Sequence, residues 1–283
     1  MSIKEIEFLI KKYDLKIKKQ YGQNFLIDDN IVRKIAETID PEPKATVIEI
    51  GPGLGSLTKH LSHRFEKVLC YEIDSQMVDI LRQEMHEDNI YIIHQNFLKS
   101  NIKDDIDAFA PNNRVVVIAN LPYYITTPIL IKILEEAPFI SEILVMMQKE
   151  VADRICGKPS TKDYNSLSVL IQFLTEPKKL FNISPKSFIP SPDVDSSVVL
   201  IKRKESFAED VIDLDYFYRF NRTIFQQRRK TIVNNLASFL GYSKGMIGEM
   251  LKREGISENA RAESLTVEQI VRLANRFYQQ DNQ

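Results

Sequence analysis

The sequence has no tryptophan, only two cysteines and only nine glycines among its 283 residues. Cys70 and Cys156 lie far apart and make no disulfide framework of the kind that stabilises small secreted proteins. No apolar run approaches the roughly 20 residues that a membrane-spanning helix needs, and residues 1–5 do not read as a signal peptide. These absences predict a globular protein of the cytoplasm with no membrane segment.

The sequence also lacks a metal-binding cluster. His60 and His63 lie three residues apart on a predicted helix, but no group of Cys, Asp or Glu with ligand spacing joins them. Arrangements typical of a protein nucleophile, Ser-His-Asp or Cys-His, are missing as well. We therefore expect chemistry that needs neither a metal nor a nucleophilic side chain.

Net charge is close to zero, at −1, which argues against a uniformly basic nucleic-acid-binding protein. The charge is uneven, because residues 1–20 hold six Lys against three acids and residues 216–235 hold four Arg and one Lys with no acid. These segments carry +3 and +5, so the rest must carry −9 to give −1. Two basic segments on an acidic body are typical of a protein that binds a polyanion at chosen places.

Strand and helix patterns alternate through the first two thirds of the chain. A helix is predicted from Asp28 through Ile39, and further helices near 55–63, 75–86 and 127–136. Apolar strand patterns occupy residues 47–50, 68–72, 91–94, 115–119, 143–147 and 198–201. This alternation predicts an α/β fold with a doubly wound, mostly parallel sheet.

The sequence pattern changes toward the C-terminus. Four prolines over residues 177–192 predict a stiff loop. Beyond about residue 205 the strand patterns stop, and residues 213–283 show helical periodicity with a capping box at Thr266 and Gln269. We expect two domains, residues 1–204 and 205–283.

A glycine-rich turn follows the first predicted strand, with the sequence Glu49-Ile50-Gly51-Pro52-Gly53-Leu54-Gly55. Glycines let the backbone approach a ligand closely, and Glu72, at the end of the second strand, is placed to accept from ribose hydroxyls. A dinucleotide site uses the spacing G-x-G-x-x-G, whereas these glycines run G-x-G-x-G after an acid. That acid suits the cationic amino-acid end of S-adenosylmethionine better than a pyrophosphate. A tight strand-to-helix turn without ligand, and an NAD-dependent dehydrogenase, are the alternatives.

The ends of two other strands add candidate site residues. Asn96-Phe97 follows the third strand, where the ring could pack on an adenine face. Asn120-Leu121-Pro122-Tyr123-Tyr124 follows the strand at 115–119, and open α/β sheets bind ligands at this edge. The Asn120 side-chain oxygen and the Leu121 carbonyl could both accept from one exocyclic amine, while Tyr123 offers a stacking face. The alternative is a plain strand-to-helix turn, with Thr127 as N-cap before Pro128.

Together these motifs resemble the ribosomal RNA adenine dimethyltransferases, specifically the KsgA branch. The motifs that carry the resemblance are Gln23-Asn24-Phe25-Leu26, the turn from Glu49 to Gly55, Asn120-Leu121-Pro122-Tyr123, Gln148-Lys149-Glu150, Pro185-x-x-Phe188-x-Pro190-x-Pro192-x-Val194-Asp195-Ser196, Phe225-Gln226-Gln227-Arg228-Arg229-Lys230-Thr231 and Arg261-Ala262-Glu263-Ser264-Leu265. They extend over nearly the whole chain.

This resemblance implies a class I methyltransferase with a Rossmann-like sheet and a small C-terminal all-helical domain. It implies S-adenosylmethionine-dependent N6,N6-dimethylation of two adjacent adenosines near the 3′ end of 16S rRNA, within an immature small ribosomal subunit. Residues 1–204 would then be the cofactor-binding catalytic domain, and residues 205–283 an RNA-binding domain. We expect a monomer with a role in small-subunit biogenesis.

The resemblance also assigns roles to single residues. The expected catalytic residues are Asn120, Leu121, Tyr123 and Phe188, with the two rings sandwiching the target adenine. The expected cofactor-binding residues are Gln23, Asn24, Leu26, Gly51, Gly53, Gly55, Glu72, Ile73, Asn96, Phe97 and Asn120. Asn96 departs from the family, which usually has Asp there, so we expect weaker cofactor affinity.

RNA binding is predicted on a helix over residues 216–235. On a helical wheel Arg219, Arg222, Gln226, Arg229 and Lys230 share one face, opposite an apolar face. Arg228 falls on the apolar side and is expected to tie the helix to the catalytic domain. A merely solvated face is the structural alternative.

Two other functions remain open at this point. One is a large-subunit rRNA methyltransferase of the macrolide-resistance type, against which the larger helical domain and Leu121 argue. The other is a non-catalytic RNA-binding assembly factor on the same fold, against which the presence of Asn120, Tyr123 and Phe188 argues.

Overall fold

The computed structural model describes residues 1–18, 21–42, 44–111, 113–205, 210–239 and 241–282. Internal contacts divide the chain into two compact units. The first unit comprises Met1–Ala152 and Lys178–Arg203, and the second Asp153–Pro177 and Lys204–Gln283. The longer segment of the second unit begins at Lys204, at the predicted domain boundary. The second unit also includes residues 153–177, which we predicted to belong to the first domain.

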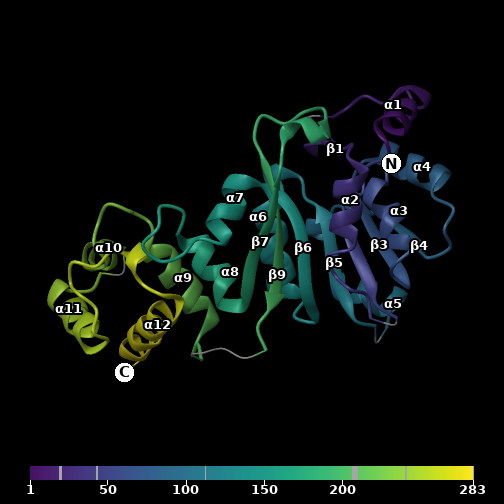
Figure 1. Cartoon of the computed structure of the whole chain (residues 1–283). Helices are drawn as coiled ribbons and strands as arrows, with labels where there is room; N and C mark the ends of the chain where they lie inside the picture. Colours follow the sequence, from purple (N-terminus) through teal and green to yellow (C-terminus); the bar gives the residue numbers. More distant parts are fainter. Residues whose placement is uncertain (19–20, 43, 112, 206–209, 240, 283) are drawn as a thin grey trace. The chain divides into compact units, whose positions relative to one another are not determined.

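A seven-stranded sheet forms the centre of the fold, in the order β4-β3-β2-β5-β6-β9-β7 (Figure 1). Strands β2 to β6 pair in parallel, and β9 runs antiparallel to β6. The strands are β2 Thr46–Ile50, β3 Lys67–Glu72, β4 Ile90–His94, β5 Val115–Asn120, β6 Ile140–Gln148, β7 Thr175–Ile183 and β9 Ser196–Arg203. The predicted Rossmann-like, mostly parallel sheet is therefore confirmed.

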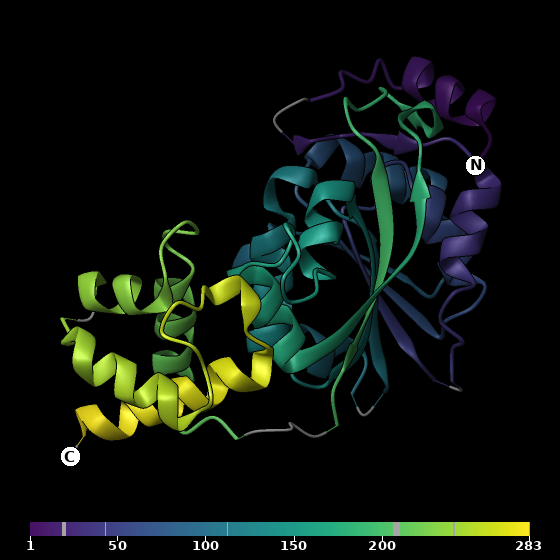
Figure 2. The same ribbon diagram turned by 60° about the vertical axis from the view of Figure 1, so that its left-hand side comes forward.

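Burial explains why these segments are strands. Every residue of β2 is buried, and so are the first five of β5, because helices cover both faces of the sheet (Figures 1 and 2). Continuous runs of Val and Ile suit such two-sided burial. Strand β7 was missed, since Pro177 within it and the three prolines that follow it predicted a loop; it lies at the edge of the sheet, where Pro177 is tolerated.

Several helices of the first unit begin at polar caps, although α3 begins after Gly55 without a side-chain cap. Asp28 and Asp74 accept from backbone N–H groups at the starts of α2 and α4. α6 differs, because it begins at Thr126 after Ile125 and has no side-chain cap, so the N-cap predicted at Thr127 is wrong. The helices are α1 Ile3–Lys12, α2 Asp29–Ala36, α3 Ser56–Ser62, α4 Ser75–Glu84, α5 Ile102–Phe109, α6 Thr126–Glu136 and, crossing into the second unit, α7 Lys149–Ile155.

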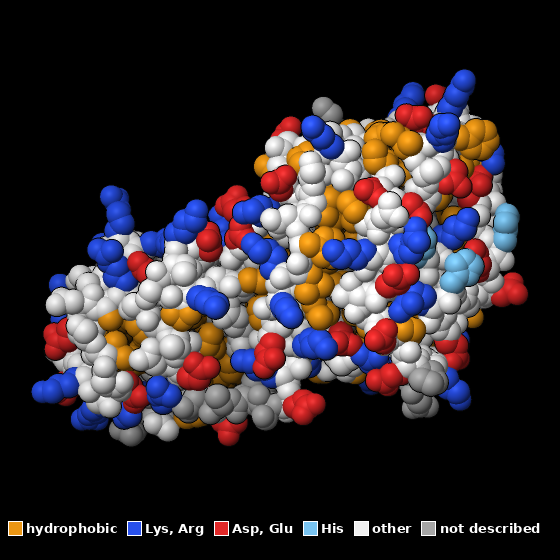
Figure 3. Space-filling view, in the orientation of Figure 1, with side chains coloured by type: hydrophobic (Ala, Val, Ile, Leu, Met, Phe, Trp, Pro, Cys, Tyr) orange, Lys and Arg blue, Asp and Glu red, His pale blue; other side chains and the backbone are white. Residues whose placement is uncertain are grey.

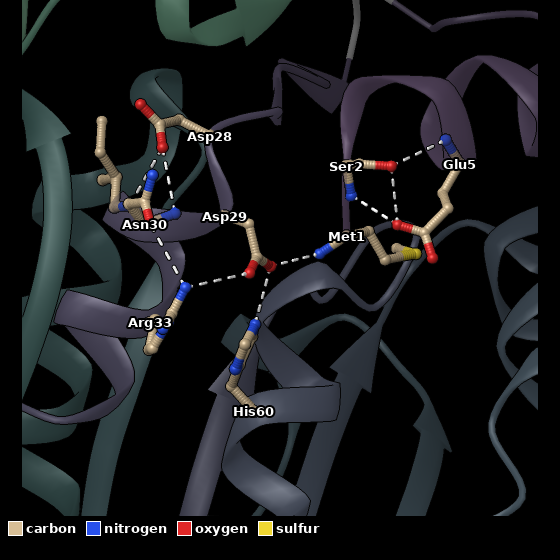
Figure 4. A network of polar contacts seen from close by, with 9 residues as sticks. Met1, Ser2, Glu5, Asp28, Asp29, Asn30, Arg33 and His60 are labelled. Carbon is tan, nitrogen blue, oxygen red and sulfur yellow. Dashed lines mark hydrogen bonds and ion pairs between the residues drawn. The ribbon is translucent and has the colours of Figure 1, made fainter.

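Asp29, at the start of α2, joins three separate parts of the first unit (Figure 4). Its Oδ1 accepts from the Met1 amino group at 2.8 Å and lies 2.9 Å from His60 Nε2 on α3. Hydrogen bonds from these two groups lower the pKa of Asp29 to about 2. His60 thus serves a polar network, and among the described residues no group of three or more His, Cys, Asp or Glu could hold a metal ion.

A small antiparallel pair joins distant segments of the first unit. β1 Phe25–Leu26 pairs with β8 Phe188–Ile189, with Leu26 opposite Phe188. Phe25 packs in a cluster with α1 and α4, whereas Leu26 and Phe188 pack in the main core. The pair therefore fixes the segment that precedes α2 against the sheet.

The second unit is helical (Figure 2), and aromatic rings pack in its interior. Phe217 lies 4.8 Å from Phe173, and Phe220 lies 5.5 Å from Phe277, measured between ring centroids. Its helices are α8 Ser166–Leu174, α9 Leu214–Ile224, α10 Ile232–Phe239, α11 Lys244–Arg253 and α12 Val267–Asp281, the last with the predicted capping box.

The prediction of one continuous helix over residues 216–235 is wrong. α9 ends at Ile224 and α10 begins at Ile232, with a turn between them. Asn235 stabilises this break, because its Nδ2 donates to the Ile224 carbonyl at 2.7 Å and so satisfies a carbonyl at the helix end. In the part of the chain that the structure describes, no helix is long and apolar enough to cross a membrane.

Candidate active site

A cavity lies at the carboxyl ends of four neighbouring strands, β4, β3, β2 and β5. This is the edge at which open α/β sheets bind ligands. The cavity is lined by residues 21–26 before α2, by the glycine turn after β2, and by the ends of β3, β4 and β5. Of the predicted site residues it collects Gln23, Asn24, Leu26, Gly51, Gly53, Glu72, Ile73, Asn96, Phe97, Asn120, Leu121 and Tyr123.

The glycine turn needs glycine for conformation and for space. Gly51 and Gly53 have φ values of +70° and +59°, which side-chain-bearing residues rarely adopt. A Cβ at Gly53 would lie 3.1 Å from the Phe25 ring. Gly55 does not line the cavity; it precedes α3 with φ +81°, and a Cβ there would lie 2.9 Å from Met85. Its glycine is thus explained by helix packing, and its predicted cofactor contact stays a prediction.

Glu72 ends β3 with a buried, well-satisfied carboxylate. Its Oε1 accepts from the Ile73 and Asp74 N–H groups, each at 2.8 Å, and its Oε2 accepts from Gly53 N–H at 3.3 Å. Burial raises its pKa, and the backbone donors oppose that shift. Because the Gly53 contact is long, Oε2 retains capacity to accept from a ligand hydroxyl at the cavity wall.

Glu49 precedes the glycine turn and is 2% exposed, yet it lines the cavity. Burial raises the pKa of this carboxyl to about 8. Its neighbour across the sheet is the Cys70 thiol, 3.7 Å from Oε2, and within the described residues no cation pairs with it. A buried carboxyl without a cation favours a positively charged ligand group beside it.

Aromatic rings line the cavity near the ends of β3 and β4. Tyr71 and Phe97 meet edge to face with centroids 5.1 Å apart, and the Tyr71 hydroxyl donates to Asp105 on α5 at 2.8 Å. Asn96 Oδ1 accepts from Leu98 N–H at 3.0 Å, so it caps the short helical turn that places Phe97. A flat ring could pack against this wall, as predicted for adenine.

Asn120 is the last residue of β5, and the two polar atoms of its side chain differ in their hydrogen bonding. Nδ2 donates to the Asn24 backbone carbonyl at 3.3 Å, while among the described residues no donor reaches Oδ1. The Leu121 N–H donates to Met146 O at 3.1 Å, and the Pro122 carbonyl accepts from Thr126. Among the residues that the structure describes, no donor reaches the Leu121 carbonyl either. Two oxygen acceptors are therefore available at the positions predicted from the sequence.

The two predicted stacking rings lie in different surroundings. Tyr123 is half-buried, lines the cavity, and its hydroxyl lies 2.5 Å from Ser196 Oγ. Phe188 is 2% exposed, packs in the main core beside Leu26, and does not line the cavity. The structure does not bring the two rings together around one cavity, because pairing with β1 draws Phe188 inward. Its stacking role stays a prediction.

The segment of residues 21–24, before β1, closes one side of the cavity, and no sequence pattern predicted how this segment is held. Asp74, 1% exposed, accepts from Lys18 Nζ at 2.6 Å and from Gln23 Nε2 at 2.9 Å. We missed Asp74 because its position before Ser75 indicated only a helix N-cap, a role that it also fills. Tyr71 was missed as well, since it sits in an ordinary apolar strand pattern, and Ser196 was seen only as the end of a family motif, with no role assigned.

The predicted RNA-binding cations lie in the second unit. Arg219 and Arg222 are exposed on α9, whereas Arg229 and Lys230 are exposed in the turn before α10, so the shared helical face is wrong. Within the described ranges none of the four has an acidic partner. Arg228 is also exposed and donates to the Lys162 carbonyl at 2.7 Å, a contact inside the second unit. Basic side chains are interspersed with acidic ones over the visible face of this unit (Figure 3).

Comparison with known proteins decides the family. A sequence model described as ribosomal RNA adenine dimethylase matches residues 14–279. The chain belongs to this family. The resemblance seen in its motifs is confirmed, and a dehydrogenase is not supported.

Curated relatives of this adenine dimethylase match over nearly their full length. A Bacillus pumilus protein named ribosomal RNA small subunit methyltransferase A is 43% identical over 272 residues, which cover 94% of this chain and 93% of the relative. A Geobacillus protein of the same name is 44% identical over 273 residues, covering 94% of each.

Solved structures share the fold. The 23S rRNA methyltransferase ErmE is 25% identical with a TM-score of 0.69, covering 89% of this chain and 98% of ErmE. A dimethyladenosine transferase from Plasmodium falciparum has a TM-score of 0.76 at 24% identity, covering 91% and 98%. The second likeness concerns the fold alone.

Proposed function

We propose that this chain dimethylates N6 of two adjacent adenosines near the 3′ end of 16S rRNA, with S-adenosylmethionine as methyl donor. One observation carries the chemistry: Asn120 Oδ1 and the Leu121 carbonyl are two acceptors that no donor of the described residues reaches, and they line the cavity with the Tyr123 ring. This arrangement matches an exocyclic amine on a flat ring, since the amine donates twice and the ring stacks.

Asn120 and Leu121 would act by orienting the target nitrogen. Its lone pair is delocalised into the adenine ring, and accepting both N–H bonds favours a pyramidal nitrogen whose lone pair faces the methyl donor. Orientation of this kind can contribute about 7–11 kcal/mol to lowering a barrier. The alkylated amine is acidic and can lose its proton to water, so a strong base is unnecessary.

The residues of the cavity fit S-adenosylmethionine. Glu72 Oε2 would accept from ribose hydroxyls, the Tyr71 and Phe97 wall would hold the adenine, and buried Glu49 would lie at the cationic amino-acid end. When bound, the cofactor supplies a methyl group already activated by its sulfonium. The chain's own task is therefore to bind, orient and exclude water.

The names of the close relatives, small subunit methyltransferase A, support the small ribosomal subunit as substrate. Extruding an adenine from its stack costs a few kcal/mol, which stacking on Tyr123 would offset. Arg219, Arg222, Arg229 and Lys230 would bind RNA phosphates. We expect a monomer that acts in the cytoplasm on an immature subunit during its biogenesis.

A labelling experiment tests this function. Small subunits that lack the modification and matched large subunits are incubated with wild-type protein and S-adenosylmethionine carrying a labelled methyl group, and the label is mapped. We expect four methyl groups per small subunit, two on each of two adjacent adenosines. Label on large-subunit rRNA would favour the second candidate, suggested by the likeness to ErmE. Particle binding without label would indicate a non-catalytic assembly factor.

A further inference from the structure

The Tyr123 hydroxyl does not point to open solvent but meets a buried partner. Ser196 is fully buried, and its Oγ lies 2.5 Å from the Tyr123 oxygen. Both residues lie in the first unit, Tyr123 in the turn after β5 and Ser196 at the start of β9. The contact therefore joins the candidate base-stacking ring to a strand two places away in the sheet.

The position of Ser196 is fixed by the backbone on both sides. It stands opposite Gln148, the last residue of β6, in the antiparallel pairing of β6 with β9. Just before it, the Asp195 carbonyl accepts from Lys149 N–H at 2.9 Å. Two motifs without a role so far, Gln148-Lys149-Glu150 and the end of the proline-rich segment, thus meet where Ser196 is held.

On the Tyr123 side the backbone is constrained, but the ring is less so. The Pro122 carbonyl accepts from Ile125 N–H at 3.2 Å and from Thr126 Oγ1 at 3.0 Å, which fixes the turn. The ring still turns about two side-chain bonds, and one of its faces must remain open for a base. A hydrogen bond at the far end of the ring restricts that freedom without covering the face.

We propose that Ser196 is a positioning residue, which holds the Tyr123 ring in the orientation that receives the target adenine. The inference rests on the proposed function, because it takes Tyr123 as the stacking residue. Ser196 contacts neither the adenine nor the cofactor and acts through the ring. The Tyr123 hydroxyl accordingly serves as an anchor and has no part in the chemistry.

A double-mutant cycle tests this role, with Ser196→Ala, Tyr123→Phe and the double variant assayed on small subunits. Each single variant should lower the single-turnover rate about fivefold to tenfold, the range of one hydrogen bond. The double variant should lose no more, because both changes break the same contact. Affinity for the particle and for S-adenosylhomocysteine should change less than about twofold, since phosphate contacts dominate RNA affinity.

Two further variants separate positioning from packing. Ser197→Ala is the matched control, because Ser197 is equally buried on β9 but its hydroxyl bonds to Asn182 at 2.8 Å; it should keep the wild-type rate. Ser196→Thr retains the hydroxyl and should recover most of the rate. In crystals, the Tyr123 ring should occupy several rotamers in Ser196→Ala and one rotamer in Ser197→Ala.

Three outcomes would overturn the inference: a wild-type rate for Ser196→Ala, multiplicative losses in the double variant, or a single unchanged Tyr123 rotamer in Ser196→Ala. Failure of the proposed function would look different, because the wild-type protein would then label no adenosine of the small subunit. The crystallographic comparison decides the positioning role even in that case, since it requires no turnover.

Discussion

Asn120 Nδ2 donates to the backbone carbonyl of Asn24, 96 residues earlier in the chain, across 3.3 Å. This bond ties the end of β5 to the segment before β1 that closes one side of the cavity. It also leaves Oδ1 as the side-chain atom that can accept from a substrate. The orientation of the predicted catalytic amide therefore depends on the same segment that is proposed to enclose the cofactor.

That segment should control cofactor release. Asp74→Asn removes the charge that holds Lys18 and Gln23 but preserves a good N-cap for α4. We expect affinity for S-adenosylhomocysteine to fall about threefold to tenfold, mainly through faster dissociation, because a charge-assisted contact is lost. Stopped-flow displacement measures this. Asp28→Asn is the control, since it caps α2 without holding the segment; equal release rates in both variants would exclude this role.

Because the pKa of Glu49 is raised, we expect the stability of the cofactor-free protein to depend on pH. Its pKa is about 8 when folded and 4.5 when unfolded, so between these values the folded protein binds the extra proton. The unfolding free energy should therefore fall as pH rises toward 8. Relative to Glu49→Gln, the wild type should lose about 2 kcal/mol between pH 6 and pH 8.

Denaturant titrations at the two pH values measure that difference. Glu37→Gln, at an exposed position on the surface, should keep the wild-type dependence on pH. Identical pH dependence in Glu49→Gln and the wild type would show that Glu49 is ionised in the folded protein throughout this range.

Replacing Asn96 by Asp, the residue usual in the family, should tighten cofactor binding. In Asn96→Asp one carboxylate oxygen would still cap the turn at Leu98, and the second would accept from the adenine amine with a full charge. We expect the Kd for S-adenosylhomocysteine, measured by calorimetry, to fall about threefold to tenfold. Asn101→Asp makes the same change at the cap of α5, outside the cavity, and should leave the Kd unchanged. Weaker binding in Asn96→Asp would contradict the proposed adenine contact.

The basic residues of the second unit should govern docking on the particle. Arg222→Glu with Arg229→Glu should weaken small-subunit binding and reduce the slope of log K against log salt by about 2, as expected for two lost phosphate contacts. Lys59→Glu with Lys103→Glu changes the charge equally on exposed positions of the first unit. If both pairs weaken docking alike, net charge rather than these arginines explains the effect.

Much of the first unit followed from the sequence for a physical reason. Strands such as β2 and β5 are buried on both faces, so their apolar runs are unbroken and easily recognised. α5 was missed because only Ile102 and Ile106 of its eight residues are buried, which leaves a weak periodic pattern. The break between α9 and α10 contains neither Gly nor Pro, and its stability comes from Asn235, a tertiary contact.

The candidate site likewise contains residues that could be predicted from the sequence and residues that could not. Residues at the ends of strands were predictable, because parallel strands bring their carboxyl ends to one edge. The placement of Phe188 was not, since it depends on the pairing of β8 with β1, two short strands more than 160 residues apart. The contacts of Asp74 and Ser196 likewise arise only from the folded arrangement.

The most direct test of the central claim compares methyl transfer and docking for Asn120→Ala. Single-turnover labelling of small subunits is measured alongside particle affinity for this variant and the wild type. The account predicts that labelling falls at least about 100-fold, as for the loss of one preorganised hydrogen-bonding group at a reaction centre, while particle affinity stays within about twofold. Labelling at the wild-type rate would contradict the assignment of Asn120 as the acceptor of the adenine amine.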